Sequence, residues 1–394
     1  MEHYLRRAWA EIDLDRALLN LQNIKKEADG RFIMPVVKAD AYGHGANVLT
    51  KLYEDNGAEG FAVSNINEAI KLRKHGITKS ILVLGFTPVE YINQLYAFNI
   101  TQTVYCSEYA ESLSAAAKEN NFTIKVHIKL DTGMCRLGFN CRNEGFEDYE
   151  DLKACLSLPS LVFEGIFTHF SSADSENEID IKYSDKQYDL FTKTIKKLKS
   201  DGFEFKYIHC SNSAASVLRS NDEGNLIRPG IILYGASPDD KLNLTYERTP
   251  IMSVKSAVAM VKTIKKDEVV SYGRTFTAPK DMTIATVPIG YADGYPRAMS
   301  NCGKVIIGGQ YANVVGRVCM DQLLIDVSNI DKVEIGSIVT LIGKDGELSI
   351  SFDDIAAISG TIAYEIMCNI SIRMPRVYNK NGKTVDVVYL GGTL

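Results

Sequence analysis

The sequence predicts an N-terminal (β/α)8 barrel followed by a smaller, β-rich C-terminal domain. Over the first 235 residues, short apolar runs alternate with segments of helical periodicity. After about residue 245, closely spaced apolar runs separated by Gly, Asp and Asn replace that alternation. The length of 394 residues exceeds what one hydrophobic core usually supports, so two domains are expected.

The barrel is predicted from its candidate strands, which are residues 32–38, 60–64, 81–85, 101–105, 124–130, 162–168, 207–212 and 226–232. Helical patterns separate them at 46–56, 66–76, 108–120 and 182–201. Asn65 and Gly76 are suitable residues to begin and end the second of these helices. Eight strands separated by helices are typical of a (β/α)8 barrel. An open, doubly wound sheet shows the same alternation and stays an alternative.

The C-terminal domain is predicted to be an antiparallel barrel or sandwich. Its candidate strands are 253–264, 281–290, 304–308, 313–318, 323–327 and 337–343. One helix is expected at 352–359, and residues 238–250 are the natural linker. The expected domains are therefore 1–245 and 246–394, with residues 1–12 available to pair with the second domain.

Composition excludes several classes of protein. With 44 basic and 49 acidic residues the formal charge is −5, so neither nucleic acid nor an anionic membrane is an expected partner. No window reaches the ~18 apolar residues of a membrane-spanning helix, and the charged first thirty residues lack a signal-peptide core. None of the eight cysteines forms a CxxC pair or a zinc-finger spacing, so no metal is expected. We expect a reduced, cytoplasmic protein.

Lys38 ends an apolar run, FIMPVVK, and precedes a glycine-punctuated turn. Burial against an apolar wall would lower the pKa of its amine and make it a nucleophile for a carbonyl. The aldehyde of pyridoxal 5′-phosphate (PLP) is such a carbonyl. The alternative is an ordinary lysine that extends from a strand end into solvent.

In a barrel, residues at the carboxyl ends of the strands meet on one rim. The predicted strands bring together Lys38, Tyr42, Lys129, Asp131, His169, Asn212, Ser213, Arg228, Gly230 and Ile231. Backbone amides around Gly230, with the hydroxyls of Ser213 and Tyr42, could hold a phosphate, although such residues are also common in loops. Arg228 inside an apolar strand requires a planar partner, either a ligand or a carboxylate. His169 could equally be an ordinary buried histidine.

Two further residues have a chemical and a structural interpretation. Arg136, in KLDTGMCRLGF, could anchor a substrate carboxylate or simply form an ion pair within its loop. Tyr272, in SYGRTF, could act as a general acid or base where nearby positive charge lowers its pKa, although such a tyrosine more often only packs.

Taken together, nine segments resemble the characteristic segments of bacterial alanine racemases. They are KADAYGHG, KLDTGMCRLGF, FTHF, SNSAA, IRPGIILYG, SYGRTF, PIGYADGYPR, VGRVCMDQ and GTIAYE. The resemblance runs from WAEIDLD at residue 9 to RMPRVY near residue 378. It implies a PLP-binding barrel with a β-rich domain, in a homodimer that shares its active sites between subunits.

The resemblance also implies roles for individual residues. Lys38 would carry PLP, and Lys38 and Tyr272, the latter from the partner subunit, would be the two bases on opposite faces of the substrate. The cofactor would further contact Tyr42, His169, Asn212, Ser213, Arg228, Gly230, Ile231 and Tyr364. Arg136, Met320 and Asp321 would bind the substrate. Tyr291, Asp174, Arg297 and Arg317 would line a narrow access channel, and Lys129 matches a position that is carbamylated in many members.

Substrate choice depends on the segment GTIAYE. Ala363 stands where the family pattern commonly has asparagine. Related serine racemases of vancomycin-resistance systems replace the tyrosine at the position of Tyr364 by asparagine, so Tyr364 favours alanine. A serine or dual alanine/serine racemase stays an alternative, as does, less favoured, a barrel-type PLP decarboxylase. The expected function is interconversion of L- and D-alanine, which supplies D-alanine for peptidoglycan.

Overall fold

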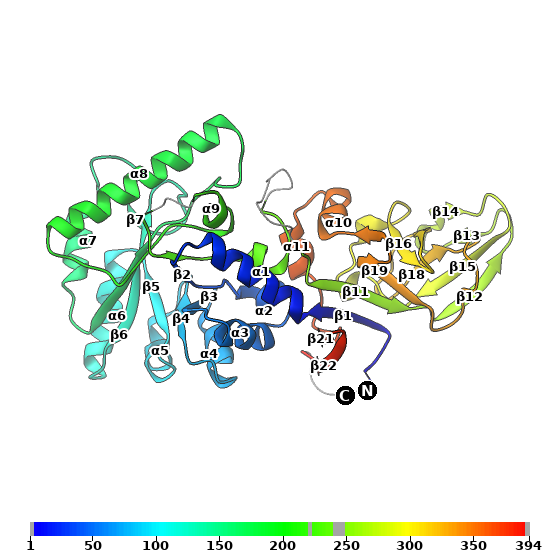
Figure 1. Cartoon of the computed structure of the whole chain (residues 1–394), viewed down its shortest axis with the longest axis horizontal. Helices are drawn as coiled ribbons and strands as arrows, with labels where there is room; N and C mark the ends of the chain where they lie inside the picture. The colour runs from blue at the N-terminus through cyan, green and yellow to red at the C-terminus, as the bar shows by residue number, and fades with distance from the viewer. Residues whose placement is uncertain (1–3, 220–222, 239–248, 391–394) are drawn as a thin grey trace.

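The computed structural model describes residues 4–219, 223–238 and 249–390. Figure 1 shows a barrel surrounded by helices at one end of the molecule and a β-rich domain at the other. The predicted domain boundary after residue 245 and most of the predicted linker at 238–250 lie outside the described residues.

In the described residues, the wall of the barrel consists of six strands in one parallel sheet and two in a separate parallel pair. They are β2 (Phe32–Ile33), β3 (Gly60–Val63), β4 (Ser80–Val83), β5 (Thr101–Val104), β6 (Ile124–Asp131), β8 (Leu161–Phe167), β9 (Tyr207–His209) and β10 (Leu226–Ile227). Six of them, β3-β4-β5-β6-β8-β9, form one ladder to which the short β7 (Phe139–Asn140) adds, and β10 pairs with β2. A bridge from Val36 to Ala62 and a hydrogen bond from Arg228 N to Ser211 O, 2.9 Å, complete the ring. The barrel prediction is confirmed, and the open-sheet alternative is wrong.

Three barrel strands are well short of the predicted ones: β9 ends at His209 rather than at residue 212, and two others are shorter still. The apolar runs 32–38 and 226–232 form strand only over their first two residues. In each run a proline, Pro35 or Pro229, follows two residues after the strand ends, and it has no N–H to continue the ladder. The residues after each proline are therefore free to turn across the rim.

Helices cover the outside of the barrel. They are α1 (Leu14–Glu27), α3 (Ala46–Asp55), α4 (Ile66–Lys74), α5 (Ile92–Ala97), α6 (Ser107–Glu119), α7 (Tyr149–Leu156), α8 (Glu178–Ser200) and α9 (Ser213–Leu218). Asn65 caps α4 as predicted, because its side chain accepts the N–H of Glu68. Helix α8 begins four residues before the predicted start at 182, because Asn177 caps it there.

The β-rich domain contains a sheet that begins with an N-terminal strand. Strand β1 (Ala8–Asp13) pairs antiparallel with β11 (Met252–Ala257) and parallel with β21 (Arg376–Lys380). The same sheet holds β16 (Lys304–Ile307), β17 (Gln310–Asn313), β19 (Ile338–Asp345), β20 (Leu348–Ile350) and β22 (Lys383–Val388). A second sheet comprises β12 (Met260–Ile264), β15 (Met282–Val287) and β18 (Leu323–Asp326), and β13 (Val269–Val270) pairs with β14 (Phe276–Thr277).

Two local predictions for this domain have different outcomes. Helix α10 (Phe352–Ser359) lies where the sequence predicts it, with Ser351 as its cap. The strand predicted at 313–318 is wrong beyond Asn313, where only Val314 forms a bridge, to Ile325. Gly316, at φ +76°, turns the chain out of the extended conformation.

One continuous apolar core joins the two domains, and it includes residues of α1, of the barrel strands and of β11 and β19. Helix α11 (Ala363–Cys368) packs on the rim beside the segment Lys38–Tyr42, labelled α2. This contact fixes one face of the second domain against the barrel rim. None of the helices in the described ranges has the length and apolar character needed to cross a bilayer.

Candidate active site

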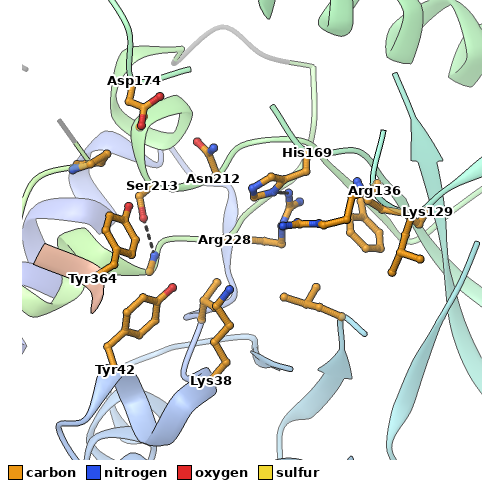
Figure 2. A pocket seen from close by; sticks show the side chains of 17 residues that line it. Lys38, Tyr42, Lys129, Arg136, His169, Asp174, Asn212, Ser213, Arg228 and Tyr364 are labelled. Carbon is orange, nitrogen blue, oxygen red and sulfur yellow. Dashed lines mark hydrogen bonds between the residues drawn. The ribbon is translucent and has the colours of Figure 1, made fainter. Parts of the chain in front are cut away.

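A pocket with a volume of about 180 Å³ opens at the carboxyl ends of the barrel strands. Figure 2 shows Lys38 and Tyr42 rising into it from one segment, with Arg228 and His169 opposite. Eleven of the residues predicted from the sequence line it: Lys38, Tyr42, Lys129, Arg136, His169, Asp174, Asn212, Ser213, Arg228, Gly230 and Tyr364. Within the described ranges, Tyr364 alone of the lining residues comes from beyond residue 238.

Lys38 begins a left-handed turn. Ala39, Asp40 and Ala41 have φ of 52–55° and ψ of 47–51°, and Tyr42 follows at φ 53°. These are ideal left-handed helical angles, which cost non-glycine residues about 1–2 kcal/mol each. Hydrogen bonds from Ala41 N to Val37 O and from Gly43 N to Ala39 O, both 2.9 Å, close the turn. Packing and hydrogen bonds to other segments must therefore offset this strain.

The two glycines of KADAYGHG let the C-terminal domain approach the turn. A Cβ on Gly43 would lie 2.4 Å from the carbonyl oxygen of Met367, and one on Gly45 would lie 1.8 Å from the hydroxyl of Tyr378. The Tyr378 hydroxyl donates to His44 O at 3.0 Å, and Arg376 Nε donates to Gly43 O at 2.8 Å. The turn that carries Lys38 is therefore held partly by β21.

The amine of Lys38 lies in a desolvated and electropositive place. Burial is the main cause that lowers the pKa of Lys38, and the positive charge of Arg136 lowers it further. Glu68 and Cys368 act in the opposite direction. A larger share of Lys38 is therefore the neutral, nucleophilic amine than in an exposed lysine.

Arg228 is buried and pairs with carbonyls and imidazoles. Its Nη2 donates to Thr168 O at 2.8 Å and to Cys210 O at 3.1 Å, and its Nη1 lies 2.6 Å from His209 Nδ1. No carboxylate pairs with it among the described residues. Desolvation lowers its pKa to about 10. The carboxylate alternative that the sequence left open is therefore wrong.

Three histidine side chains lie around Arg228 or next to one another beside it. His209 Nε2 lies 2.9 Å from His127 Nδ1, and His169 Nδ1 lies 3.4 Å from Arg228 Nη2. Burial, together with the positive charge of Arg228, lowers the pKa of all three imidazoles, that of His127 to about 3. Since Arg228 can only donate, Nδ1 of His209 is the accepting nitrogen and Nε2 carries its proton.

Hydroxyl and amide groups gather at the other end of the pocket (Figure 2). Gly230 N donates to Ser213 Oγ at 2.8 Å, and a Cβ on Gly230 would lie 2.6 Å from the Tyr42 hydroxyl. The rings of Tyr42 and Tyr364 are 6.0 Å apart. Asn212 Oδ1 accepts from Ala215 N at 3.0 Å, and the buried Ile231 begins a 3₁₀ turn directly after Gly230. Figure 2 places Lys38 between this group and Arg228.

Lys129 and Arg136 form the wall beyond His169. Lys129 is buried with its Nζ 4.9 Å from the centre of the Phe167 ring. Burial, Arg228 and Arg136 lower its pKa well below the usual value. Asp131, which the sequence also placed at the rim, has a different role. Its Oδ1 accepts from Gly133 N and Cys135 N and so shapes the loop that contains Arg136.

The remaining predicted residues form a second cluster on the C-terminal domain: Tyr272, Tyr291, Arg297, Arg317, Met320 and Asp321. Tyr272 follows β13, which lies at the end of the molecule far from the barrel in Figure 1, and its side chain is 73% exposed. In one chain, Tyr272 and Met320 are therefore not in the pocket of Lys38. Asp174 is separated from the other predicted channel residues, since it lines the barrel pocket.

Backbone hydrogen bonds assemble this second cluster. Tyr291 N donates to Cys319 O at 3.1 Å and Ala292 N to Met320 O at 3.0 Å. Ser271 Oγ donates to Arg317 O at 2.8 Å, next to Tyr272. The Arg297 segment joins through Val318 N, which donates to Ser300 Oγ at 3.0 Å. These contacts bring together the segments that carry the exposed Tyr272, Tyr291 and Arg297 and the half-buried Arg317.

Comparison with known proteins identifies the family. Sequence profiles described as alanine racemase, N-terminal domain and C-terminal domain match residues 12–238 and 251–378. The chain is 42% identical to alanine racemase 1 of Clostridium acetobutylicum, over 98% of this chain and 99% of that one. It is similar in structure to alanine racemase of Clostridium difficile 630, with a TM-score of 0.92, 38% identity and coverage of 99% and 100%. It is also similar to alanine racemase of Bacillus anthracis with bound L-Ala-P, with a TM-score of 0.91 and 36% sequence identity. That match covers 98% of this chain and 99% of the other.

The barrel with its lysine pocket and the β-rich domain define an amino acid racemase, an enzyme that acts on a small molecule. The chain belongs to the alanine racemase family.

Sequence reasoning missed the apolar part of the pocket and the supports of the turn. Val36, Leu84, Leu137, Phe167, Ala214 and Pro238 also line the pocket. Val36, Leu84 and Phe167 lie near the ends of predicted strands and Ala214 lies two residues after one, so their positions could have indicated them, whereas Leu137 and Pro238 lie farther along their loops. Glu68 and Arg376, which hold the turn, lie far from it in sequence and carry no local signal.

Proposed function

We propose that this protein interconverts L- and D-alanine with PLP as cofactor, in a homodimer whose sites combine two subunits. The observation that carries the proposal is the desolvated amine of Lys38 in one pocket with the buried guanidinium of Arg228, in a chain of the alanine racemase family. Racemisation needs two groups that exchange a proton with opposite faces of one carbon.

The donors around the pocket fit PLP. Ser213, Tyr42, Tyr364 and the backbone at Gly230 and Ile231 would hold the phosphate, with Asn212 beside them. A Cβ at residue 230 would displace the Tyr42 hydroxyl, so glycine there lets that hydroxyl stay beside the backbone. Arg228 would face the ring nitrogen, His169 would pack against the ring, and Lys38 would bind the aldehyde. When bound, PLP supplies an electron sink for the charge that remains after the α-proton leaves.

The chain's own residues handle the proton and the substrate. The neutral amine of Lys38 would take the proton from one face of the α-carbon, and in the opposite direction its ammonium form would return a proton to that face. The partner subunit's Tyr272 would serve the other face. Arg136, with the backbone of the partner subunit's Met320 and with its Asp321 nearby, would hold the substrate carboxylate. The fixed carboxylate orients the α-carbon between the two bases.

Exposure of the second cluster supports the homodimer. Tyr272, Met320 and Tyr291 are 73%, 53% and 43% exposed in one chain, and such an apolar and aromatic surface marks an interaction site. Docked over the barrel of a second copy, it would supply Tyr272 and the missing side of the pocket. Asp174 of one subunit would then line the access channel with Tyr291, Arg297 and Arg317 of its partner.

Lys129 is a candidate for carbamylation. Its buried amine lies beside Arg136, and burial lowers the pKa of Lys129 well below its usual value. Attack of the amine on CO₂ would release one proton and form a carbamate, whose negative charge would orient the Arg136 guanidinium. An intact mass larger by one CO₂, with ¹³C incorporation from labelled bicarbonate, would support it. An unmodified Lys129 in a fully active enzyme would refute it.

Alanine is favoured as the substrate over serine. Tyr364 narrows the pocket, whereas Ala363 is buried outside the lining, so its departure from the family pattern does not widen the site. The test compares kcat/KM for L-alanine and L-serine on the purified, PLP-loaded protein by the D-enantiomer formed. A strong preference for alanine supports the proposal, and comparable turnover of serine would reassign the substrate. The eight cysteines are all free thiols, as in a reducing compartment, and this supports a cytoplasmic enzyme. Its D-alanine would supply peptidoglycan.

A further inference from the structure

Glu68 connects two segments that the sequence keeps far apart. Its Oε1 accepts from Ala39 N at 2.8 Å and its Oε2 accepts from Ser64 N at 2.7 Å. Ala39 is the first strained residue of the left-handed turn, directly after Lys38, and Ser64 follows the end of β3. One carboxylate therefore ties the start of the turn to the barrel wall.

This use of the carboxylate differs from ordinary helix capping. Asn65 is the N-cap of α4 and Glu68 is its third helical residue, the positions of a capping box. In that motif the glutamate would turn back to the N–H of the cap residue itself. Here it accepts from the preceding N–H, that of Ser64, and its other oxygen reaches Ala39 across 29 positions of sequence. Local helix stability does not require the second contact.

Other hydrogen bonds also hold the left-handed turn in place. Asp40 Oδ1 accepts from Ala46 N and from Lys71 Nζ, both at 3.1 Å, so α4 holds the turn through a second residue. At the far end, Arg376 Nε donates to Gly43 O. Lys38 itself is near Arg136, Glu68, Cys368 and His169, and of these Glu68 and Cys368 raise its pKa. Glu68 thus acts on both the position and the charge of Lys38.

We propose that Glu68 is a positioning residue that holds the left-handed turn and thereby directs the Lys38 amine into the pocket. The consequence for catalysis rests on the function proposed above for Lys38, whereas the conformational part does not. A glutamine at this position would offer one accepting oxygen and one N–H₂ group, which would face an N–H donor. Glu68→Gln therefore loses one charge-assisted hydrogen bond and weakens the other.

The test uses the apoprotein of Glu68→Gln with Glu54→Gln as matched control. Glu54 also accepts from two backbone N–H groups, those of Thr78 and Lys79, but it contacts neither Lys38 nor the turn. Amide hydrogen exchange of residues 39–45 and the pH dependence of Lys38 acetylation, read by mass spectrometry, report on the turn and on the amine. Glu68→Asp keeps the negative charge but has a side chain one methylene shorter. It replaces Glu68→Gln as the test variant if the glutamine variant folds poorly.

We expect Glu68→Gln to speed exchange at 39–45 on the order of tenfold or more and to lower the pKa of Lys38, while Glu54→Gln changes neither. Glu68→Asp should loosen the turn with a smaller change in the pKa of Lys38. Wild-type exchange at 39–45 and an unchanged Lys38 pKa in Glu68→Gln would overturn the proposal. If exchange rises as expected while racemisation of the PLP-loaded variant is unaffected, the positioning of the turn stands and the function proposed for Lys38 fails.

Discussion

Substitution of Gly45 by alanine should destabilise the protein through a specific clash with Tyr378. The new methyl would lie 1.8 Å from the Tyr378 hydroxyl and 3.1 Å from Cζ, so the buried ring must move and lose its hydrogen bond to His44 O. Overpacking costs about 1–3 kcal/mol, the lost hydrogen bond about 1 kcal/mol, and a non-glycine residue at φ +91°, ψ 92° about 1–3 kcal/mol more. The expected loss of unfolding free energy is about 3–7 kcal/mol.

Two further variants separate the clash from the backbone strain. Gly202 has the same φ of +91° with nothing within 4 Å of its added Cβ, so Gly202→Ala should cost only the strain. Tyr378→Phe removes the nearest clashing atom, so Gly45→Ala in the Tyr378→Phe background should cost about 1–3 kcal/mol less than in the wild type. Urea unfolding followed by fluorescence of the single, buried Trp9 measures the wild type and all four variants. The clash would be refuted if the losses of unfolding free energy in Gly45→Ala and Tyr378→Phe simply added in the double variant. Equal losses in Gly45→Ala and Gly202→Ala would refute it too.

Three other perturbations test the buried charges. Arg228→Lys should lower the unfolding free energy of the apoprotein by about 3 kcal/mol, because one ammonium cannot reach all the carbonyls and imidazoles that the guanidinium contacts. A loss below ~1 kcal/mol in urea unfolding would contradict this. Acidification should destabilise the protein from about pH 6.5 downward, because burial lowers the pKa of His44 to about 4 and that of His127 to about 3, so the unfolded chain binds more protons. The slope should be about 1.4 kcal/mol per pH unit for each histidine, and a His44→Gln variant with an unchanged slope between pH 6 and pH 4 would refute the assignment. Asp293→Ala should cost about 3–5 kcal/mol, because it leaves Arg7 partly buried without its carboxylate; thermal unfolding that matches the wild type would show that the pair contributes little.

The barrel and most of its rim could be predicted because they depend on local pattern. Each apolar run bounded by turn residues became a strand, and its last residues necessarily faced the rim. Lys38, His169, Ser213 and Arg228 were found in this way. The prolines at 35 and 229 show where the same pattern overestimated strand length, since a missing N–H ends a ladder that hydrophobicity alone would continue.

The left-handed turn could not be predicted from its own residues. Alanine, aspartate and tyrosine have no preference for positive φ strong enough to specify four such residues in succession. Distant groups impose the conformation: Glu68 from α4, and Arg376 and Tyr378 from β21. Periodicity likewise gave no indication that Asp174 would line the barrel pocket while the other channel residues lie on the second domain.

A dimer of two inactive subunits shows directly whether Lys38 and the partner subunit's Tyr272 act in one site. Lys38→Ala and Tyr272→Phe proteins, each expected to be inactive alone, are coexpressed with different affinity tags, and the doubly tagged dimer is isolated and loaded with PLP. If sites are shared between subunits, one site of this dimer keeps both residues, and activity should return to about half that of the wild-type dimer. If each chain builds its own site, every site carries one lesion, and a doubly tagged dimer without activity would contradict the account.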